Sequence, residues 1–173
     1  MTRIFSRILR QMGWLRGASI AIAFCLTLTL GATPAIATTD RYINRFIARE
    51  PVAIPYDAQG QTKTFTPDDF YQGKELFKSH CIYCHVGGTT IQDPRISLSL
   101  EALAGATPPR NNVSAIAEFM HDPMNYDGSD YSIWCRQVTE DWMPQADLER
   151  LAAFILRAGE KSPGWGNSNV ELR

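Results

Sequence analysis

The stretch Cys81-Ile82-Tyr83-Cys84-His85 decides what kind of fold this 173-residue chain adopts. Two thiols three positions apart on one helical turn can reach the two vinyl groups of a single porphyrin and form thioethers with it. His85 follows directly and can place an imidazole nitrogen on the iron from the same side. The C-x-x-C-H spacing therefore predicts one covalently bound haem c, held by Cys81 and Cys84, with His85 as the proximal iron ligand.

Two other readings of a C-x-x-C pair lack support in the rest of the sequence. A thioredoxin-like redox pair is expected near a βαβ pattern, and half of a zinc site needs two further Cys or His ligands at matching spacing. The chain has 4 cysteines and 3 histidines in total, and none of the others is arranged in that way. Haem attachment remains the chemistry that fits this motif.

Helix signals flank the motif on both sides. Thr66 and Pro67 are typical of a helix start, and the helix is expected to run to about Ser79. Gly73 lies on the apolar face of this helix, where it would let another helix approach the backbone closely. Near the end of the chain, an apolar stripe that begins at Leu148 predicts a second long helix. Gly159, followed by a proline, is expected to end it.

The sequence of the middle of the chain predicts two short helices and one turn. Residues 98–104 and 113–120 are expected to be helical, with a break at Thr107-Pro108-Pro109 between them. Residues 56–61 have the composition of a turn that joins two short extended segments. Because strand-like alternation never lasts more than a few residues, the fold class expected is all-α.

Residues 1–37 have the order of a secretory signal peptide. Four arginines precede the uncharged residues 18–30, and the small-residue pattern Ala35-x-Ala37 follows. The apolar run is shorter than the roughly 20 residues that cross a bilayer, which argues against the alternative of an uncleaved membrane anchor. We therefore expect export with cleavage after Ala37, an N-terminal arm over residues 38–55, and a monohaem cytochrome c domain over residues 56–173.

The charge of the chain and the absence of known catalytic motifs exclude several classes of function. The whole chain has 17 basic and 18 acidic side chains, but the first 37 residues hold four of the arginines and no acid. The exported part therefore carries a net charge of −5, which disfavours nucleic-acid binding and suits a basic partner surface. The sequence offers no paired carboxylates, nucleophile triad or phosphate loop, so we expect an electron carrier and not an enzyme.

Several side chains compete for the second axial position on the iron. Met143 precedes a proline, as in many small cytochromes in which methionine is the ligand, although methionine is also common in cores. Cys135 has apolar neighbours and could equally be a buried inert thiol. His121 lies where a helix should end, and His80 lies on the side of the motif itself. The following residues are expected to wall a haem crevice: Tyr83, Ile91, Phe119, Met120, Tyr126 and Trp134.

Four motifs make the chain resemble the cytochrome c-550 family, the extrinsic haem subunits on the lumenal side of cyanobacterial photosystem II. They are Tyr71-x-Gly73-Lys74-x-Leu76-Phe77, His85-Val86-Gly87-Gly88, Ala106-Thr107-Pro108-Pro109-Arg110 and Tyr126-Asp127-Gly128. The resemblance covers residues 54–165 and is strongest to a divergent branch of the family. It implies a class I c-type cytochrome fold, in which N- and C-terminal helices pack around one haem. It also implies a thylakoid-lumen location and a low redox potential.

One departure from the family concerns the sixth ligand. Cytochromes c-550 use a second histidine that follows the Tyr-Asp-Gly motif, whereas no histidine follows His121 in this sequence. Cys135 is the residue nearest to that position, so the resemblance implies Cys135 as the sixth ligand, with Met143 as the alternative. A thiolate stabilises ferric iron and lowers the potential, and a thioether has the opposite effect.

Three functions stay open at this point. The first is electron transfer in the thylakoid lumen, with photosystem II lumenal subunits or a soluble protein as partner, and with partial substitution for cytochrome c-550. The second is a structural extrinsic subunit, peripheral to the thylakoid membrane, whose redox activity is incidental. The third is a haem-thiolate sensor, which requires a sixth position that opens. The amphipathic residues 38–51 are expected to form a solvated tail, although they could also offer a surface for a dimer.

Overall fold

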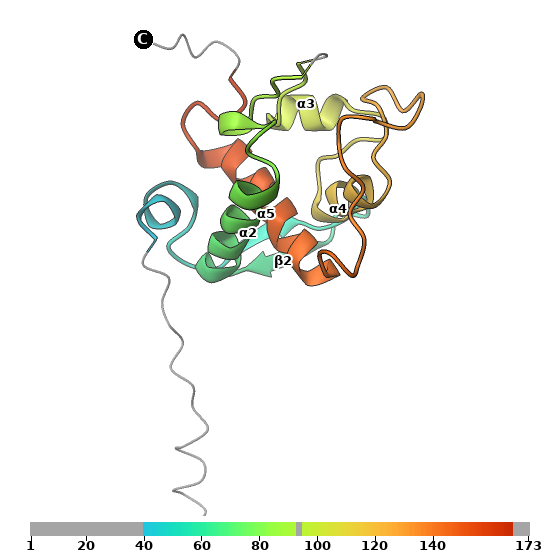
Figure 1. Cartoon of the computed structure of the whole chain (residues 1–173). Coiled ribbons are helices and arrows are strands. Elements are labelled where there is room, and N and C mark those ends of the chain that lie inside the picture. Colours follow the sequence, from blue (N-terminus) through green and yellow to red (C-terminus); the bar gives the residue numbers. More distant parts are fainter. Residues whose placement is uncertain (1–39, 93–94, 168–173) are drawn as a thin grey trace, which may run out of the picture. The chain divides into compact units, whose positions relative to one another are not determined.

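The computed structural model describes residues 40–92 and 95–167 (Figure 1). The predicted signal peptide and its cleavage site lie outside the described residues. The elements are, in chain order, η1 (Ile43–Ile47), β1 (Val52–Pro55), β2 (Thr62–Phe65), α2 (Pro67–His80), η2 (Val86–Gly88), α3 (Leu100–Gly105), α4 (Val113–His121) and α5 (Gln145–Lys161). Within the described residues, no helix is long and apolar enough to cross a membrane.

Helix α2 starts where the sequence predicts it. The Thr66 side chain accepts a hydrogen bond from the Asp69 backbone N–H at 3.2 Å, and the Asp69 carboxylate accepts one from the Thr66 N–H at 2.8 Å. This reciprocal capping box pairs two N–H groups that the helix cannot pair internally, and Pro67 in the first turn has no N–H that needs a partner. The helix runs to His80, so the expectation that it ends near Ser79 is confirmed.

Helices α2 and α5 cross in close contact and form the centre of the core (Figure 1). A Cβ atom built at Gly73 would lie 2.2 Å from the Arg150 carbonyl oxygen and 2.9 Å from the Phe154 Cβ. No side chain larger than hydrogen fits there, which confirms the predicted role of Gly73. Around the crossing, Phe70 and Leu148 are fully buried.

Helices α3 and α4 confirm the two short helices predicted in the middle of the chain, and α5 confirms the C-terminal one. Their bounds differ slightly from those expected, because α3 covers Leu100–Gly105 and not 98–104, and α5 continues past Gly159 to Lys161. A Cβ at Gly159 would meet the Leu100 side chain at 3.1 Å, so this glycine allows α3 to approach α5 instead of ending the helix.

The expected turn at residues 56–61 joins two short antiparallel strands, β1 and β2. Val52 pairs with Phe65 and Pro55 with Thr62. The Asp57 carboxylate accepts hydrogen bonds from the N–H groups of Gln59 and Gln61, which closes the turn. The fold is thus helical with one small hairpin.

Residues 40–51 do not form a solvated tail, so that expectation is wrong. Ile43 and Ile47 of η1 are buried at 0% and 2% exposure in the main core. Asp40 forms an ion pair with Lys74 of α2, and the Arg157 guanidinium of α5 donates to the Ile47 carbonyl at 2.9 Å. The apolar face that a dimer could have used is therefore packed inside the chain's own domain.

Glu149 of α5 holds the hairpin against the helices. Its carboxylate accepts hydrogen bonds from Lys63 of β2 and, at 3.0 Å, from the Tyr56 hydroxyl. Burial raises the pKa of Glu149, but the hydrogen bonds from Lys63, Tyr56 and Gln145 outweigh burial and leave the pKa below its usual 4.5. The ionised form is thus favoured by folding.

We expect Glu149→Gln to lower the free energy of unfolding at pH 7 by about 1–2 kcal/mol, because charge-assisted hydrogen bonds to a buried oxygen are lost. Since the folded pKa is depressed, the wild-type contribution is fully present above pH 4.5 and disappears as the pH falls through the folded value. Urea unfolding at several pH values should therefore show the two proteins converging in acid. Glu118→Gln, at an exposed position of α4, is the control; a constant difference at all pH values would contradict the argument.

Candidate haem site

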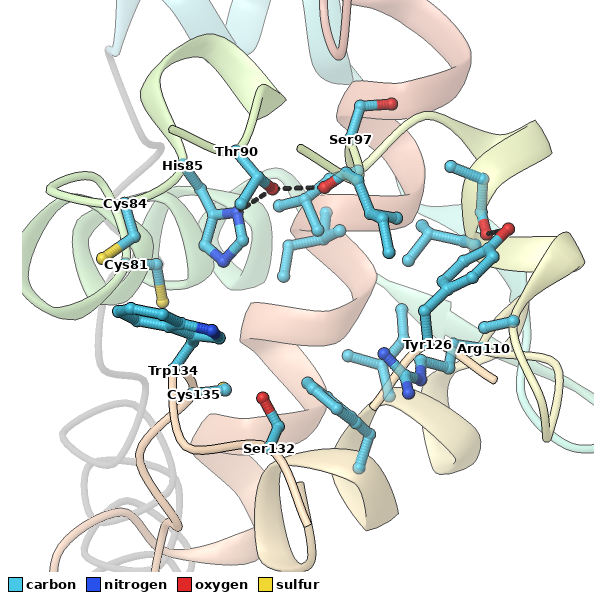
Figure 2. A pocket seen from close by; sticks show the side chains of 18 of the residues that line it. Cys81, Cys84, His85, Thr90, Ser97, Arg110, Tyr126, Ser132, Trp134 and Cys135 are labelled. Carbon is cyan, nitrogen blue, oxygen red and sulfur yellow. Dashed lines mark hydrogen bonds between the residues drawn. The ribbon is translucent and has the colours of Figure 1, made fainter. Parts of the chain in front are cut away.

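One cavity collects the chemically distinctive residues of the chain (Figure 2). It is walled by the end of α2, by α3 and α4, and by the loop between α4 and α5. The empty space of this cavity, with its opening to solvent included, measures about 1120 Å³. Its lining is mostly apolar, with Cys81, Cys84, His85 and Cys135 among the exceptions.

The C-x-x-C-H motif forms the turn that ends α2. The Cys81 N–H still donates to the Phe77 carbonyl at 2.8 Å, whereas the N–H groups of Cys84 and His85 both donate to the Cys81 carbonyl, at 3.1 and 2.9 Å. The chain thus tightens directly after the helix and brings three side chains to one wall of the cavity. Burial raises the pKa of Cys81 to about 12, with Cys135 and Cys84 nearby adding to the shift, so this thiol is neutral.

His85 presents a free ring nitrogen to the cavity. Its Nδ1 lies 3.0 Å from the Thr90 hydroxyl oxygen, which leaves Nε2 without a protein partner among the hydrogen bonds of the described residues (Figure 2). Burial lowers the pKa of the imidazole, although a backbone hydrogen bond with Thr89 opposes the shift. A neutral imidazole with one available nitrogen is what iron ligation requires.

The loop after His85 is anchored to the C-terminal end of the chain by Trp165. A Cβ at Gly88 would lie 2.6 Å from the Trp165 ring, and Gly88 has the left-handed φ of 80° that favours glycine. The indole N–H donates to the Leu98 carbonyl at 3.0 Å, and the ring packs on Phe77 at 5.2 Å between centroids. Sequence reasoning gave Trp165 no role, because nothing local to residue 165 points to residue 88.

Cys135 lies in the middle of a loop that is fastened on both sides. Before it, the Ser132 N–H donates to the Pro123 carbonyl at 2.7 Å; after it, the Val138 N–H donates to the Met120 carbonyl at 2.8 Å. Arg136, next to Cys135, stacks its guanidinium 4.5 Å from the centre of the Trp142 ring. These contacts hold Cys135 at the cavity that His85 also lines, and in Figure 2 the Trp134 indole is drawn between the two residues.

Two effects shift the pKa of the Cys135 thiol in opposite directions. Burial raises its pKa, and the nearby Arg110 guanidinium works in the other direction. Arg110 is itself fixed, since it donates to the carbonyls of Met124 and Asn125 at 2.9 Å each and lies 3.8 Å from the centre of the Phe119 ring. A cation therefore lines the same cavity as the sulfur and lies near enough to act on its charge.

The other residues considered as axial ligands point elsewhere. Met143 is buried in the core at 3% exposure and does not line the cavity. The His121 ring lies 2.8 Å from the Val138 carbonyl and 3.4 Å from the Gln145 side chain, outside the cavity. His80 packs edge-on against Trp142 at 5.4 Å. Sequence reasoning did not consider Met124, whose side chain does line the cavity.

The expected crevice walls are borne out in part. Four of the six predicted residues line the cavity: Phe119, Met120, Tyr126 and Trp134. The Tyr126 hydroxyl also donates to the Ala102 carbonyl at 3.0 Å, which ties the Tyr-Asp-Gly turn to α3. Tyr83 and Ile91 do not line it and are 82% and 57% exposed, so for these two the prediction is wrong. Tyr83 lies within the motif and Ile91 follows it by six residues, and both side chains are exposed to solvent instead of facing the cavity.

A sequence model of the cytochrome c-550 domain matches residues 43–172. The chain belongs to the cytochrome c-550 family. The cytochrome c-550-like protein of Trichodesmium erythraeum is 45% identical over 160 residues, covering 88% of this chain and 97% of the relative. Photosystem II extrinsic protein V of Gloeobacter violaceus is 41% identical over 169 residues, covering 94% of this chain and 91% of the relative.

The solved structures agree with this family membership. The PsbV2 cytochrome of Thermosynechococcus elongatus superposes with a TM-score of 0.72 at 46% identity, covering 75% of this chain and 99% of that one. The fold is therefore that of a class I cytochrome c, a helical fold with a small sheet, and the predicted fold class is confirmed.

As a member of the cytochrome c-550 family, the chain binds one covalent haem c. The cavity fits that group, because two cysteines and one imidazole share a wall and the remaining lining is mostly apolar. When bound, haem supplies one-electron chemistry at its iron. The relatives named above are cytochromes or an extrinsic subunit, in keeping with a protein that is not an enzyme.

Proposed function

We propose that this chain is a low-potential monohaem c-type cytochrome that carries electrons on the lumenal side of the thylakoid membrane, with His85 and Cys135 as axial ligands. The observation that carries the proposal is the position of Cys135. It lines the same cavity as Cys81, Cys84 and His85, and its loop is fastened on both sides by backbone hydrogen bonds. Met143 and His121, the competing candidates, do not line that cavity.

The ligand pair supports a low potential. Iron coordination deprotonates a thiol outright, so burial of Cys135 does not prevent it from acting as a thiolate. An anionic, soft ligand stabilises the ferric state. The Arg110 guanidinium nearby offsets part of the added negative charge. The chain's own residues thus supply a site in which thiolate ligation is electrostatically tolerated.

The loop contacts also favour an electron carrier over a haem-thiolate sensor. A sensor must release its sixth ligand, but Cys135 is held between the Ser132–Pro123 and Val138–Met120 hydrogen bonds and the Arg136–Trp142 stack. A movement of the Cys135 backbone away from the cavity would have to break these contacts. We therefore expect a six-coordinate low-spin iron that does not bind carbon monoxide readily in the reduced protein.

Association with photosystem II is part of the proposal. It rests on the relative named as a photosystem II extrinsic protein and on the net charge of −5 after residue 37. The predicted signal peptide would deliver the chain to the lumen, where it would be peripheral to the membrane. The same relative's name also fits a purely structural extrinsic subunit. A binding experiment therefore has to distinguish an electron carrier from a structural subunit.

We expect the purified protein to bind photosystem II membranes at low salt and to be released between about 50 and 200 mM salt, because exposed charges are screened at these ionic strengths. Membrane sedimentation across a salt series measures this. Retention through a 1 M salt wash would contradict the carrier proposal and support a docked structural subunit. The cytochrome's midpoint potential, measured on the same preparation, tests the low-potential part separately.

A further inference from the structure

The Thr90 hydroxyl makes two hydrogen bonds whose directions can be assigned by counting protons. It lies 3.0 Å from His85 Nδ1, and it also donates to the Ile96 carbonyl. A carbonyl oxygen can only accept, and a hydroxyl has a single proton. The proton of Thr90 is therefore committed to Ile96, so the hydroxyl oxygen must accept from His85 Nδ1–H.

The assignment fixes the tautomer of His85. If Nδ1 carries the proton, Nε2 carries the lone pair, and Nε2 is the nitrogen that faces the cavity (Figure 2). A hydrogen bond accepted from Nδ1–H also places electron density on the ring, which makes the imidazole a stronger donor to a metal. The acceptor here is itself polarised, because its own proton is drawn toward the Ile96 carbonyl.

The position of Thr90 is built by contacts on both sides of it. The Leu98 N–H donates to the Gly88 carbonyl at 2.7 Å, and the Ile91 N–H donates to the Cys84 carbonyl at 3.0 Å. The second bond returns the chain to the C-x-x-C-H turn directly after Thr90. The hydroxyl is therefore held between His85 and Ile96 by the backbone, as the hydrogen-bond partners of metal-bound imidazoles commonly are.

We propose that Thr90 is a positioning residue for the haem iron: it selects the Nδ1-protonated tautomer of His85 and increases the donor strength of Nε2. The inference rests on the proposed ligation of the iron by His85. It adds that the low potential is set on the proximal side as well as by Cys135.

Thr90→Val tests the proposal, because valine keeps the branched shape and removes the hydroxyl. We expect the equilibrium between ferric and ferrous protein to shift about tenfold toward ferrous, a rise in midpoint potential of about 59 mV for one electron. The g-values of the ferric protein should shift as the imidazole weakens. Thr90→Ser, which restores the hydroxyl, should return both readouts to wild-type values.

Thr89→Val is the matched control. The Thr89 hydroxyl also donates to a carbonyl of the same loop, that of Val86, at 2.6 Å, whereas the hydrogen bond between Thr89 and the His85 ring comes from the backbone, which the substitution keeps. Its removal should leave the potential and the g-values unchanged. Equal potentials for wild type and Thr90→Val, or equal shifts in Thr90→Val and Thr89→Val, would overturn the proposal.

A measurement on the wild type keeps the test independent of variant folding. In the reduced, diamagnetic protein, the Nδ1 proton of His85 should exchange slowly and show a nuclear Overhauser contact to the Thr90 methyl group. A fast-exchanging Nδ1 proton with no contact to Thr90 would overturn the proposal. The carbon-bound ring protons of His85 test iron ligation separately from the Thr90 hydrogen bond. If His85 binds the iron, the porphyrin ring current shifts these protons strongly, whichever group accepts the Nδ1 proton.

Discussion

Replacing Cys135 by serine is expected to abolish the thiolate-type low-spin spectrum of the ferric protein and to raise its midpoint potential by on the order of 0.2 V. That shift is a fraction of the about 0.8 V over which axial ligands set haem potentials. The reason is the loss of the anionic sulfur that stabilises ferric iron. The side chain is nearly isosteric, and the loop contacts of Ser132 and Val138 do not involve the sulfur, so the fold should persist.

Two controls make the Cys135→Ser result specific. Ser132→Ala changes another side chain of the same loop that lines the same cavity, and it should leave the spectrum unchanged. Met143→Leu removes the competing thioether from the core and should also leave the spectrum unchanged, at a cost in stability of less than about 1.5 kcal/mol. An unaltered ferric spectrum in Cys135→Ser, with an altered one in Met143→Leu, would assign the ligand to Met143 instead.

The second large effect is expected at the helix crossing. Gly73→Ala should lower the free energy of unfolding by about 3 kcal/mol, the upper end of ordinary overpacking. A methyl group there would lie 2.2 Å from the Arg150 carbonyl oxygen, which is backbone and cannot rotate away. Thermal unfolding followed by circular dichroism should show a melting temperature lower by roughly 10 °C.

Gly159→Ala is the matched control, since it is also a glycine-to-alanine change inside one of the two crossing helices. Its methyl group would meet the Leu100 side chain at 3.1 Å, and that side chain is partly exposed and able to move. The gain in helix propensity of up to about 1 kcal/mol offsets this contact. Equal losses of stability in the two variants would contradict the argument that backbone contact makes position 73 special.

The parts of the fold that could be predicted from sequence are those determined by residues close together in the chain. The Thr66–Asp69 cap and Pro67 specify the start of α2 within one turn. The C-x-x-C-H spacing predicts a tight turn that can attach haem for the same reason, because all its geometry lies within five residues. Gly73 could be placed at a helix contact because a glycine on the apolar face of a helix lets a second helix approach its backbone closely.

The features that escaped prediction depend on residues far apart in the chain. Burial of Ile43 and Ile47 against the main core was missed because neighbouring arginines give residues 38–51 the pattern of an exposed segment. Glu149 reaches a strand 86 residues away, and Trp165 reaches a carbonyl 67 residues away. Thr90 was missed because a threonine in a loop carries no signal until its two partners are known.

The position of Cys135, the proposed sixth ligand, could be predicted only in part. Sequence resemblance indicated the neighbourhood of Cys135, because the family's second histidine is absent there. Whether that cysteine faces the haem cavity depends on how a loop of more than twenty residues closes between α4 and α5. Its closure relies on Arg110, which donates to the carbonyls of Met124 and Asn125 from outside the loop. Local patterns alone could not have specified it.

The proposed low potential depends on ligation of the iron by His85 and the sulfur of Cys135. A low-temperature electron paramagnetic resonance spectrum of the purified ferric protein tests it most directly. We expect a low-spin signal with the compact spread of g-values that thiolate ligation produces. A low-spin signal with a broad spread, as given by histidine–methionine or bis-histidine ligation, would contradict it, and so would a high-spin signal from an open site.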